Sequence, residues 1–279
     1  MRKTVLLILT AMLVTACGTP ERGIDAGDPQ SRTQPEKYRA VGLVLEEGGA
    51  EPMLCLGTVN DSLPPQCGGL PIAEWDWDAI SGEESAAGAT WGTYEVVGNF
   101  DGRTFNLIEA GAPPDSPSGE GDSIEAACAE PSEGDPSLVS EADRLAAIKA
   151  AERSPSFAGA WIDYIDEPSE FTDPKDTILS LAFTGDLGGH EEEIREHWGG
   201  PLCVTEYEHP LTRLSEIQKE LSGDAGRDLG LEVLFSDISV NRNLVEIGVV
   251  VIDADTREEI DERYGAGTVE VTAQLQPVP

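Results

Sequence analysis

Positive charge is scarce in this chain. It has 18 lysine and arginine residues against 53 aspartate and glutamate residues, and a formal net charge of −35. Such a surface repels phosphate backbones and anionic lipid headgroups, so the composition predicts no nucleic-acid partner. The acidic residues are spread along the chain without long blocks of like charge, which favours a solvated folded surface over an acidic tail.

The chain also lacks common catalytic motifs. It has no GxSxG nucleophile elbow, no SxxK pair and no glycine-rich phosphate loop. No CxxC pair is present, which argues against a dithiol redox site and against a zinc knuckle. We therefore predict no catalytic residue, no metal ligand and no cofactor, and we expect that the protein is not an enzyme.

A long apolar run occurs at the N-terminus, but it is too short to span a bilayer. Residues 1–16 begin with two basic residues and continue as an apolar run, which is the layout of a secretory signal. Val14 to Cys17 match the lipobox of bacterial lipoproteins, so we expect an acylated Cys17 that holds the protein on the cell membrane. An ordinary secretory signal is the alternative. Residues 17–36 are rich in Gly, Pro and charge and are predicted to form a flexible tether.

Four cysteines remain besides Cys17. Export to an oxidising compartment and an even count favour two disulfides, for which three pairings are possible. We favour one bond that closes the short loop "CLGTVNDSLPPQC" and a second that ties the central linker to the C-terminal part. The favoured pairs are Cys55 with Cys67 and Cys128 with Cys203.

Residues 37–112 alternate between short apolar and polar runs, and Asp101-Gly102 separates two such runs in the manner of a β-hairpin. We predict a small all-β barrel of about five strands, similar to an OB barrel. Trp75 and Trp77 in "EWDWD" are candidate ligand-binding residues, with the neighbouring aspartates as hydrogen-bond partners of a sugar. The alternative is a strand or turn in which both aromatic side chains pack inward.

Residues 113–139 are rich in Pro, Gly, Ser and acidic residues and are predicted to be a linker. Residues 140–279 alternate between strand-type and helix-type periods, which predicts a C-terminal α+β domain with helices packed on a sheet. Ser140 is predicted to cap the first helix. We place Pro210 at the first position of a later helix, with His209 as its N-cap. A capping box is predicted at Asp255 and Glu258.

Two of the three histidines lie in "GHEEEIREHWGG", at His190 and His197. A spacing of seven separates them by two helical turns, roughly 10 Å, so one zinc ion cannot bridge them. The glutamates suit the N-terminal end of a helix dipole, while Ile194 and Trp198 supply an apolar stripe. The stretch is therefore predicted to be a solvated helix that ends at the glycine pair.

Several segments of residues 157–253 together carry a family resemblance. They are "FAGAWID", the strand "LSLAFTG", the helix before Gly199-Gly200, the strand "PLCV", the helix with Leu214 and Leu221, and the hairpin "VLFSDISVNRNLVEIGVVV". This set resembles the pro-region modules of bacterial proteases of the α-lytic type. The resemblance implies a non-catalytic sheet-and-helix domain that packs against a protease and either assists its folding or inhibits it.

The whole chain also resembles actinobacterial lipoproteins, in which "LPPQCGG", "HWGGPLCV" and the pattern RYGxG recur. That resemblance implies an extracytoplasmic, lipid-anchored protein with this architecture. Our hypothesis is a tethered two-domain binding module whose partners are the bilayer, through acylated Cys17, and an extracellular protein or glycan. The alternative is a protease inhibitor or folding helper that acts through its C-terminal domain.

Overall fold

The computed structural model describes residues 36–114, 128, 130–165 and 173–278. The predicted signal, Cys17, the tether up to residue 35 and most of the predicted linker lie outside the described residues. The chain is mostly β, with 41% strand and 23% helix. No helix of the described ranges is long and apolar enough to cross a membrane.

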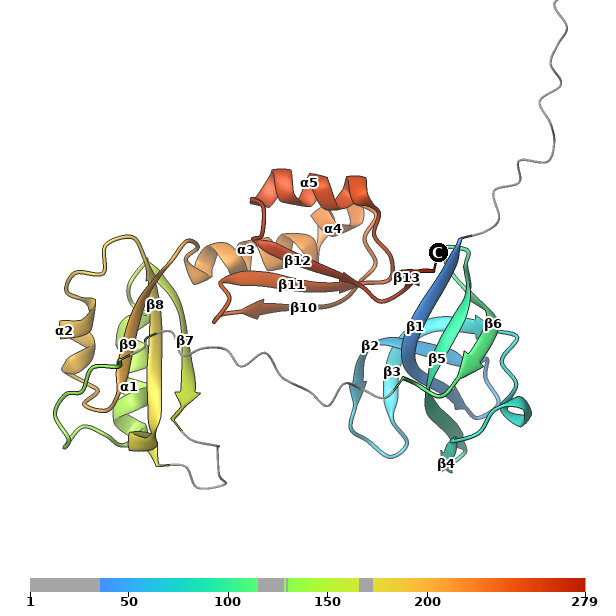
Figure 1. Ribbon diagram of the computed structural model, residues 1–279, viewed down its shortest axis with the longest axis horizontal. Coiled ribbons are helices and arrows are strands. Elements are labelled where there is room, and N and C mark those ends of the chain that lie inside the picture. Colours follow the sequence, from blue (N-terminus) through green and yellow to red (C-terminus); the bar gives the residue numbers. More distant parts are fainter. Residues whose placement is uncertain (1–35, 115–127, 129, 166–172, 279) are drawn as a thin grey trace, which may run out of the picture. The chain divides into compact units, whose positions relative to one another are not determined.

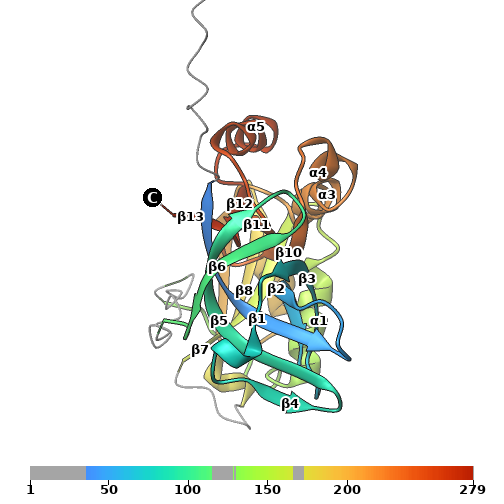
Figure 2. The ribbon, with the colours of Figure 1, turned by 90° about the vertical axis from the view of Figure 1, so that its right-hand side faces the viewer.

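The first sheet is ring-like (Figures 1 and 2). Its seven strands run in the order β13-β1-β2-β3-β6-β5-β4, and β1 also pairs with β5, which closes five of the strands on one another. All its pairings are antiparallel except β3 with β6. The strands are β1 (Lys37–Glu47), β2 (Met53–Asn60), β3 (Gln66–Ala73), β4 (Glu84–Ala86), β5 (Ala89–Phe100), β6 (Phe105–Gly111) and β13 (Gln276–Pro277).

The hairpin predicted at Asp101-Gly102 is confirmed by the antiparallel pairing of β5 with β6. Gly102 has a φ of 92°, a left-handed conformation that glycine adopts at little cost. The alternation of β5 places Tyr94 and Val96 in the interior of the ring.

The core of the ring-like sheet includes residues from the far end of the chain. Val250 and Leu275 are 1% and 0% exposed within it. The short strand β13 pairs with β1, and the Val278 N–H donates to the Lys37 carbonyl at 2.8 Å. Residues 36–279 fall in one compact unit, in which segments beyond the boundary predicted after residue 112 contribute to the core of the ring-like sheet.

The C-terminal part contains two three-stranded sheets, where the sequence analysis expected one. The first sheet has the order β7-β8-β9 and the second has the order β10-β11-β12. In each, the first two strands are antiparallel and the third is parallel to the second. Each sheet is preceded by a helix, and each parallel strand follows another helix, so the order αββαβ occurs twice (Figure 1).

The first αββαβ motif consists of α1 (Glu141–Ala151), β7 (Phe157–Tyr164), β8 (Thr177–Thr184), α2 (His190–Arg195) and β9 (Leu202–Tyr207), with a 3-10 turn η2 (Pro174–Asp176) before β8. The second αββαβ motif consists of α3 (Leu211–Leu221), β10 (Val233–Ser239), β11 (Leu244–Val249), α5 (Ala254–Tyr264) and β12 (Val269–Ala273). A short helix, α4 (Asp224–Asp228), follows α3.

Each motif has its own apolar core between its helices and one face of its sheet. The core of the first motif is made by Ala147, Ala150, Ala151, Phe157, Leu179, Leu181, Phe183, Ile194, Trp198 and Leu202. The core of the second is made by Leu214, Ile217, Leu221, Leu231, Val245, Ile247, Val249, Ile260, Tyr264, Val269 and Val271. The run "LVEIGVVVID" is apolar on both faces of a strand, which indicates a central position in a covered sheet, and β11 does lie between β10 and β12.

The helix ends show where local sequence signals were right and where they were wrong. Ser140 caps α1, as predicted, and Asp143 completes a capping box with it. The cap of α5 is Asp253, whose side chain accepts from the Thr256 N–H at 2.7 Å, so the box predicted at Asp255 and Glu258 is wrong. Pro210 is the N-cap of α3, which displaces His209 from that position.

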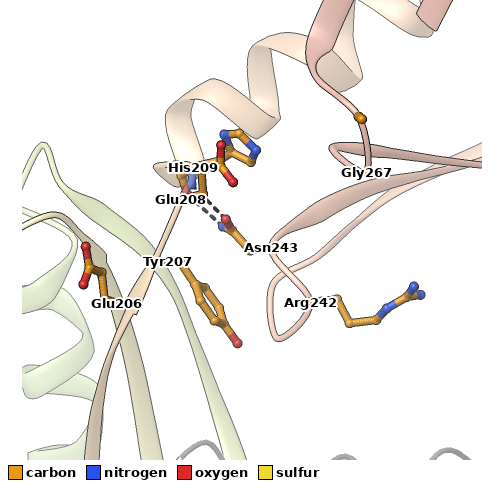
Figure 3. A pocket seen from close by; sticks show the side chains of 8 residues that line it. Glu206, Tyr207, Glu208, His209, Arg242, Asn243 and Gly267 are labelled. Atoms are coloured by element: carbon orange, nitrogen blue, oxygen red, sulfur yellow. Dashed lines mark hydrogen bonds between the residues drawn. The ribbon is translucent and has the colours of Figure 1, made fainter. Parts of the chain in front are cut away.

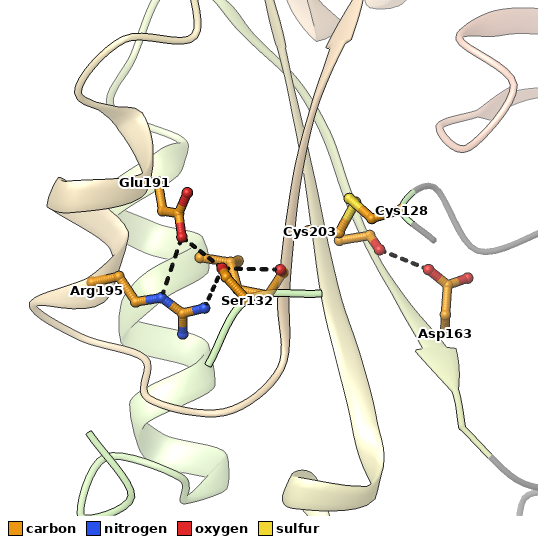
Figure 4. Close-up of a disulfide and its surroundings, with 8 residues drawn as sticks. Cys128, Ser132, Asp163, Glu191, Arg195 and Cys203 are labelled. Carbon is orange, nitrogen blue, oxygen red and sulfur yellow. Dashed lines mark hydrogen bonds and ion pairs between the residues drawn. A yellow bond between two sulfur atoms is a disulfide. The ribbon is translucent and has the colours of Figure 1, made fainter. Parts of the chain in front are cut away.

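Both favoured disulfides are present, Cys55 with Cys67 and Cys128 with Cys203. The second bond attaches Cys128 to strand β9, beside a segment that pairs with the same strand. Ser132 and Leu202 exchange two backbone hydrogen bonds of 2.9 Å. Figure 4 shows Arg195 reaching from α2 toward Ser132, whose hydroxyl accepts from its guanidinium at 2.6 Å. Residues 130–139, expected in the linker, are therefore attached to the first motif.

Candidate binding site

The two candidate tryptophans pack against the core of the ring-like sheet. The rings of Trp75 and Trp77 meet edge to face at 5.2 Å, and both lie close to the Tyr94 ring. Asp76 caps the 3-10 turn η1 (Trp77–Ala79) by accepting from the Asp78 N–H at 3.0 Å. The inward packing expected from the alternative interpretation is confirmed, and the Asp76 carboxylate is engaged in the turn.

The two indoles differ in how their N–H groups are paired. The Trp77 N–H donates to the Glu46 carboxylate at 2.9 Å. The Trp75 N–H is buried and has no hydrogen-bond partner among the described residues, and the neighbouring Tyr94 hydroxyl is also unpaired. A buried polar group without a partner costs about 1–3 kcal/mol, so this aromatic cluster is not fully satisfied by the protein alone.

Trp75 also lines an open cavity of about 570 Å³, here called the Trp75 depression. Its walls come from the loop after β1, from the end of β3 and from the turn between β5 and β6. They are formed by Glu51, Pro52, Pro71, Ile72, Ala73, Glu74, Trp75, Arg103 and Thr104. A cavity of this size lies within the range of small-molecule sites.

Backbone strain occurs at the same place. Glu74 has a φ of 63°, which places a residue with a side chain in the left-handed region. That conformation is uncommon outside glycine and asparagine, and strained residues cluster at binding and active sites. The strained position directly precedes the indole whose N–H is unpaired.

A tight turn holds the wall of the depression that Arg103 and Thr104 form. The Asp101 carboxylate accepts from the backbone N–H groups of Thr104 at 2.7 Å and of Arg103 at 2.9 Å. These hydrogen bonds, that of Thr104 first, lower the pKa of Asp101 below its ordinary value. The carboxylate is therefore charged at neutral pH and fixes the backbone of the two residues that line the cavity.

Arg103 is unusual in a chain with so many carboxylates. Its side chain is exposed and forms no ion pair within the described ranges, whereas Arg39 in the same sheet lies 3.8 Å from Glu95. A guanidinium presents five N–H donors and stays charged at any physiological pH. The Trp75 depression thus has a free cationic donor on one wall.

A second cavity, of about 550 Å³, lies where the first αββαβ motif is followed by the second (Figure 3). The Asn243 amide spans this junction: it accepts from the His209 N–H at 2.8 Å and donates to the His209 carbonyl at 2.8 Å. The His209 ring lies 3.1 Å from the Thr268 hydroxyl. Figure 3 shows Glu206 and Arg242 on opposite sides of Asn243, directed away from it. The polar groups here join the two motifs and do not converge on a ligand.

The side chain of His190 makes contacts within the first motif. The His190 ring stacks on Phe183 at 3.8 Å, and its Nε2 lies 3.4 Å from the Ser156 hydroxyl. Helix α2 ends at Arg195, so it is shorter than predicted and does not contain His197. Ile194 and Trp198 are buried, as expected. Among the described residues, no cluster of three or more His, Cys, Asp and Glu side chains could hold a metal ion.

No family model matches this chain, and no curated protein matches it.

The sequence marked Trp75 as a candidate but did not indicate the residues that surround it in the cavity. Arg103 and Glu74 carry no local pattern that marks them as ligand groups, and they lie almost thirty residues apart in the chain. The Asp101-Gly102 turn was the available signal, because a tight turn exposes the residues that follow it. Its two following residues, Arg103 and Thr104, were not assigned a role from the sequence.

Proposed function

We propose that this protein is a lipid-anchored, non-catalytic binding protein of the cell envelope. The two disulfides indicate an extracytoplasmic location. The lipobox at Val14 to Cys17 supports acylation of Cys17, and residues 17–36 would provide the reach between membrane and folded part. The bilayer and an extracellular protein or glycan are the proposed partners.

The features of the Trp75 depression are the main support for the proposed binding function. It brings together a partly exposed indole, an unpaired arginine and a strained backbone position in one cavity. Cavities lined by aromatic groups and a few convergent polar groups are typical of ligand sites. The surrounding residues offer donors and acceptors but no nucleophile beside a general base, which favours binding over catalysis.

The strand order of the ring-like sheet supports a more specific assignment of its fold. The five strands β1-β2-β3-β6-β5 close in a ring with one parallel pairing, an order that fits an OB-like barrel. We propose this barrel as the binding domain and residues 140–279 as a second domain. Because Val250, Leu275 and β13 complete the ring-like sheet, segments 36–112 and 128–279 are expressed separately, mixed and examined by circular dichroism and size-exclusion chromatography; a pair that neither folds nor associates would contradict the division.

The anchor is tested by the intact mass of the full chain isolated from bacterial membranes, beside a Cys17→Ala variant. We expect a mature mass that starts at Cys17 and carries added acyl chains, with no acylation of the variant. An unlipidated mass for the unaltered chain would refute the anchor.

The binding role is tested with the unlipidated Cys17→Ala chain and washed cell-envelope fragments. We expect the chain to sediment with the fragments and expect Arg103→Gln in the same background to sediment less. Absence of retention at every salt and calcium concentration would contradict a binding function in the envelope.

A second function, inhibition or folding of a protease, is favoured by the repeated αββαβ motif. In each motif the helices cover one sheet face, and the other face of the second motif carries exposed groups such as Phe235, which is 38% exposed. Such a surface suits a protein partner, as the pro-region resemblance implies. Titration of the full chain against secreted serine proteases tests this function; no inhibition and no complex would exclude it.

A further inference from the structure

We infer that the Trp75 depression binds a neutral sugar ring, an inference that rests on the proposed binding function and names its ligand class. The lining groups are of three chemical kinds. Glu51 and Glu74 supply carboxylate acceptors, Arg103 supplies charged donors, and the prolines at 52 and 71 supply apolar surface beside the indole. A ligand must match all three kinds at once.

The charges on the walls argue against other simple ligands. An anion would meet Glu51 and Glu74, in a chain whose formal net charge is −35. A cation would meet the guanidinium of Arg103, which no described carboxylate neutralises. A purely apolar ligand would displace water from all three charged groups without replacing their hydrogen bonds, and that displacement is unfavourable.

A pyranose ring can make favourable contacts with all three kinds of lining group. Its hydroxyl groups both donate and accept, so they can donate to the carboxylates and accept from Arg103 and the Thr104 hydroxyl. Its C–H face is apolar and flat enough to lie on an indole or a proline ring. Hydrogen bonds to charged groups are stronger than neutral ones, so both signs of charge on the walls favour a neutral polyol.

The turn at Asp101 reduces the ordering that binding requires. Its carboxylate holds the backbone of Arg103 and Thr104 through two hydrogen bonds in the ligand-free protein. A wall that is already in place loses less conformational entropy when the ligand arrives. Asp101 is therefore a positioning residue for this site.

Trp75 provides an optical readout. Its N–H is buried and unpaired in the ligand-free protein, so a small tilt of the ring toward a sugar hydroxyl would give it an acceptor. Such a tilt changes the polarity around the indole, and with it the tryptophan emission.

The experiment titrates the purified full chain, in a detergent without a sugar headgroup, with neutral gluco-, galacto- and manno-configured trisaccharides. A uronic-acid trisaccharide and a glucosamine trisaccharide serve as charged counterparts. We expect a saturable emission change with at least one neutral sugar. Arg103→Gln should weaken its binding by about tenfold or more, because a charged hydrogen-bond donor is lost. Arg103 is exposed and without an ion pair, so this variant should fold.

Lys149→Gln is the matched control, because Lys149 is exposed on α1 and also forms no ion pair within the described part of the chain. It should bind like the unaltered protein. Trp75→Phe should abolish the emission change.

Two outcomes would overturn the inference. If no neutral sugar gives a saturable change, the ligand class is wrong; Arg103-dependent binding of a charged counterpart would then show that the binding function stands. If a neutral sugar binds equally well to Arg103→Gln, its site lies elsewhere in the protein.

Discussion

The two αββαβ motifs have the same order and orientation of elements but are stabilised differently. The first has a helix of six residues, α2, and an alanine-rich face on α1, and it carries the disulfide to Cys128 and the segment around Ser132. The second has two helices of eleven residues, α3 and α5, around a core of larger aliphatic side chains. Both motifs have an apolar core, but the first adds a covalent link and a paired segment to it, whereas the second relies on its core alone.

The largest effects should come from the cores. Leu181→Ala in the first motif and Ile217→Ala in the second each remove a fully buried side chain and should lower the free energy of unfolding by about 2–5 kcal/mol. Leu145→Ala on α1 is the control, because this side chain is 48% exposed. Urea unfolding measures all three. If Ile217→Ala behaved like the control, apolar burial would not explain the second motif.

Removal of the Cys128–Cys203 disulfide should affect the first motif and leave the second unchanged. Replacing Cys128 and Cys203 by serine opens a link across 75 residues and should cost about 2–4 kcal/mol. Amide exchange should accelerate in β9 and stay unchanged in β11. The matched variant, Cys55→Ser with Cys67→Ser, opens a link across only 12 residues in the ring-like sheet and should cost less. Equal acceleration in β9 and β11 would show that the link does not act on the first motif alone.

The junction between the motifs depends on Asn243. Asn243→Ala removes two hydrogen bonds to the His209 backbone and leaves a side chain at a φ of 54°, so it should cost about 1–3 kcal/mol. Asn243→Gly relieves the strained backbone and should recover part of the loss. Thermal unfolding of the pair measures the difference, and a glycine variant less stable than the alanine variant would contradict this role of Asn243.

The smallest effects concern the helix caps. Ser140→Ala on α1 should cost about 1 kcal/mol. Asp253→Ala on α5 should also destabilise, and its effect should depend on pH. The Thr256 N–H lowers the pKa of Asp253, so the stabilisation is present above the ordinary aspartate pKa and disappears as the pH falls through the lowered value. Unfolding from pH 7 to pH 2 should show the two proteins converging in acid; a constant difference would contradict the cap.

The sequence alone determined the features that depend on neighbouring residues. The Ser140 cap, the hairpin at Asp101-Gly102 and the central strand β11 follow from turn chemistry and apolar periodicity, which act over a few residues. The two disulfide pairs were favoured correctly from loop length and domain order. The shift of the α5 cap to Asp253 shows the limit of such signals, because several acidic residues in one turn compete for the same role.

Only the tertiary structure decided which of these elements meet. Periodicity shows that one face of a strand is apolar but not which strand or helix covers it. The expected barrel therefore did not specify that its closure pairs β1 with β5, and the addition of β13 was not predictable. The same holds for the second sheet of the C-terminal part. The Trp75 depression depends on this closure: its walls come from residues 51–52, 71–75 and 103–104, which converge because β3 pairs with β6 beside the turn at Asp101.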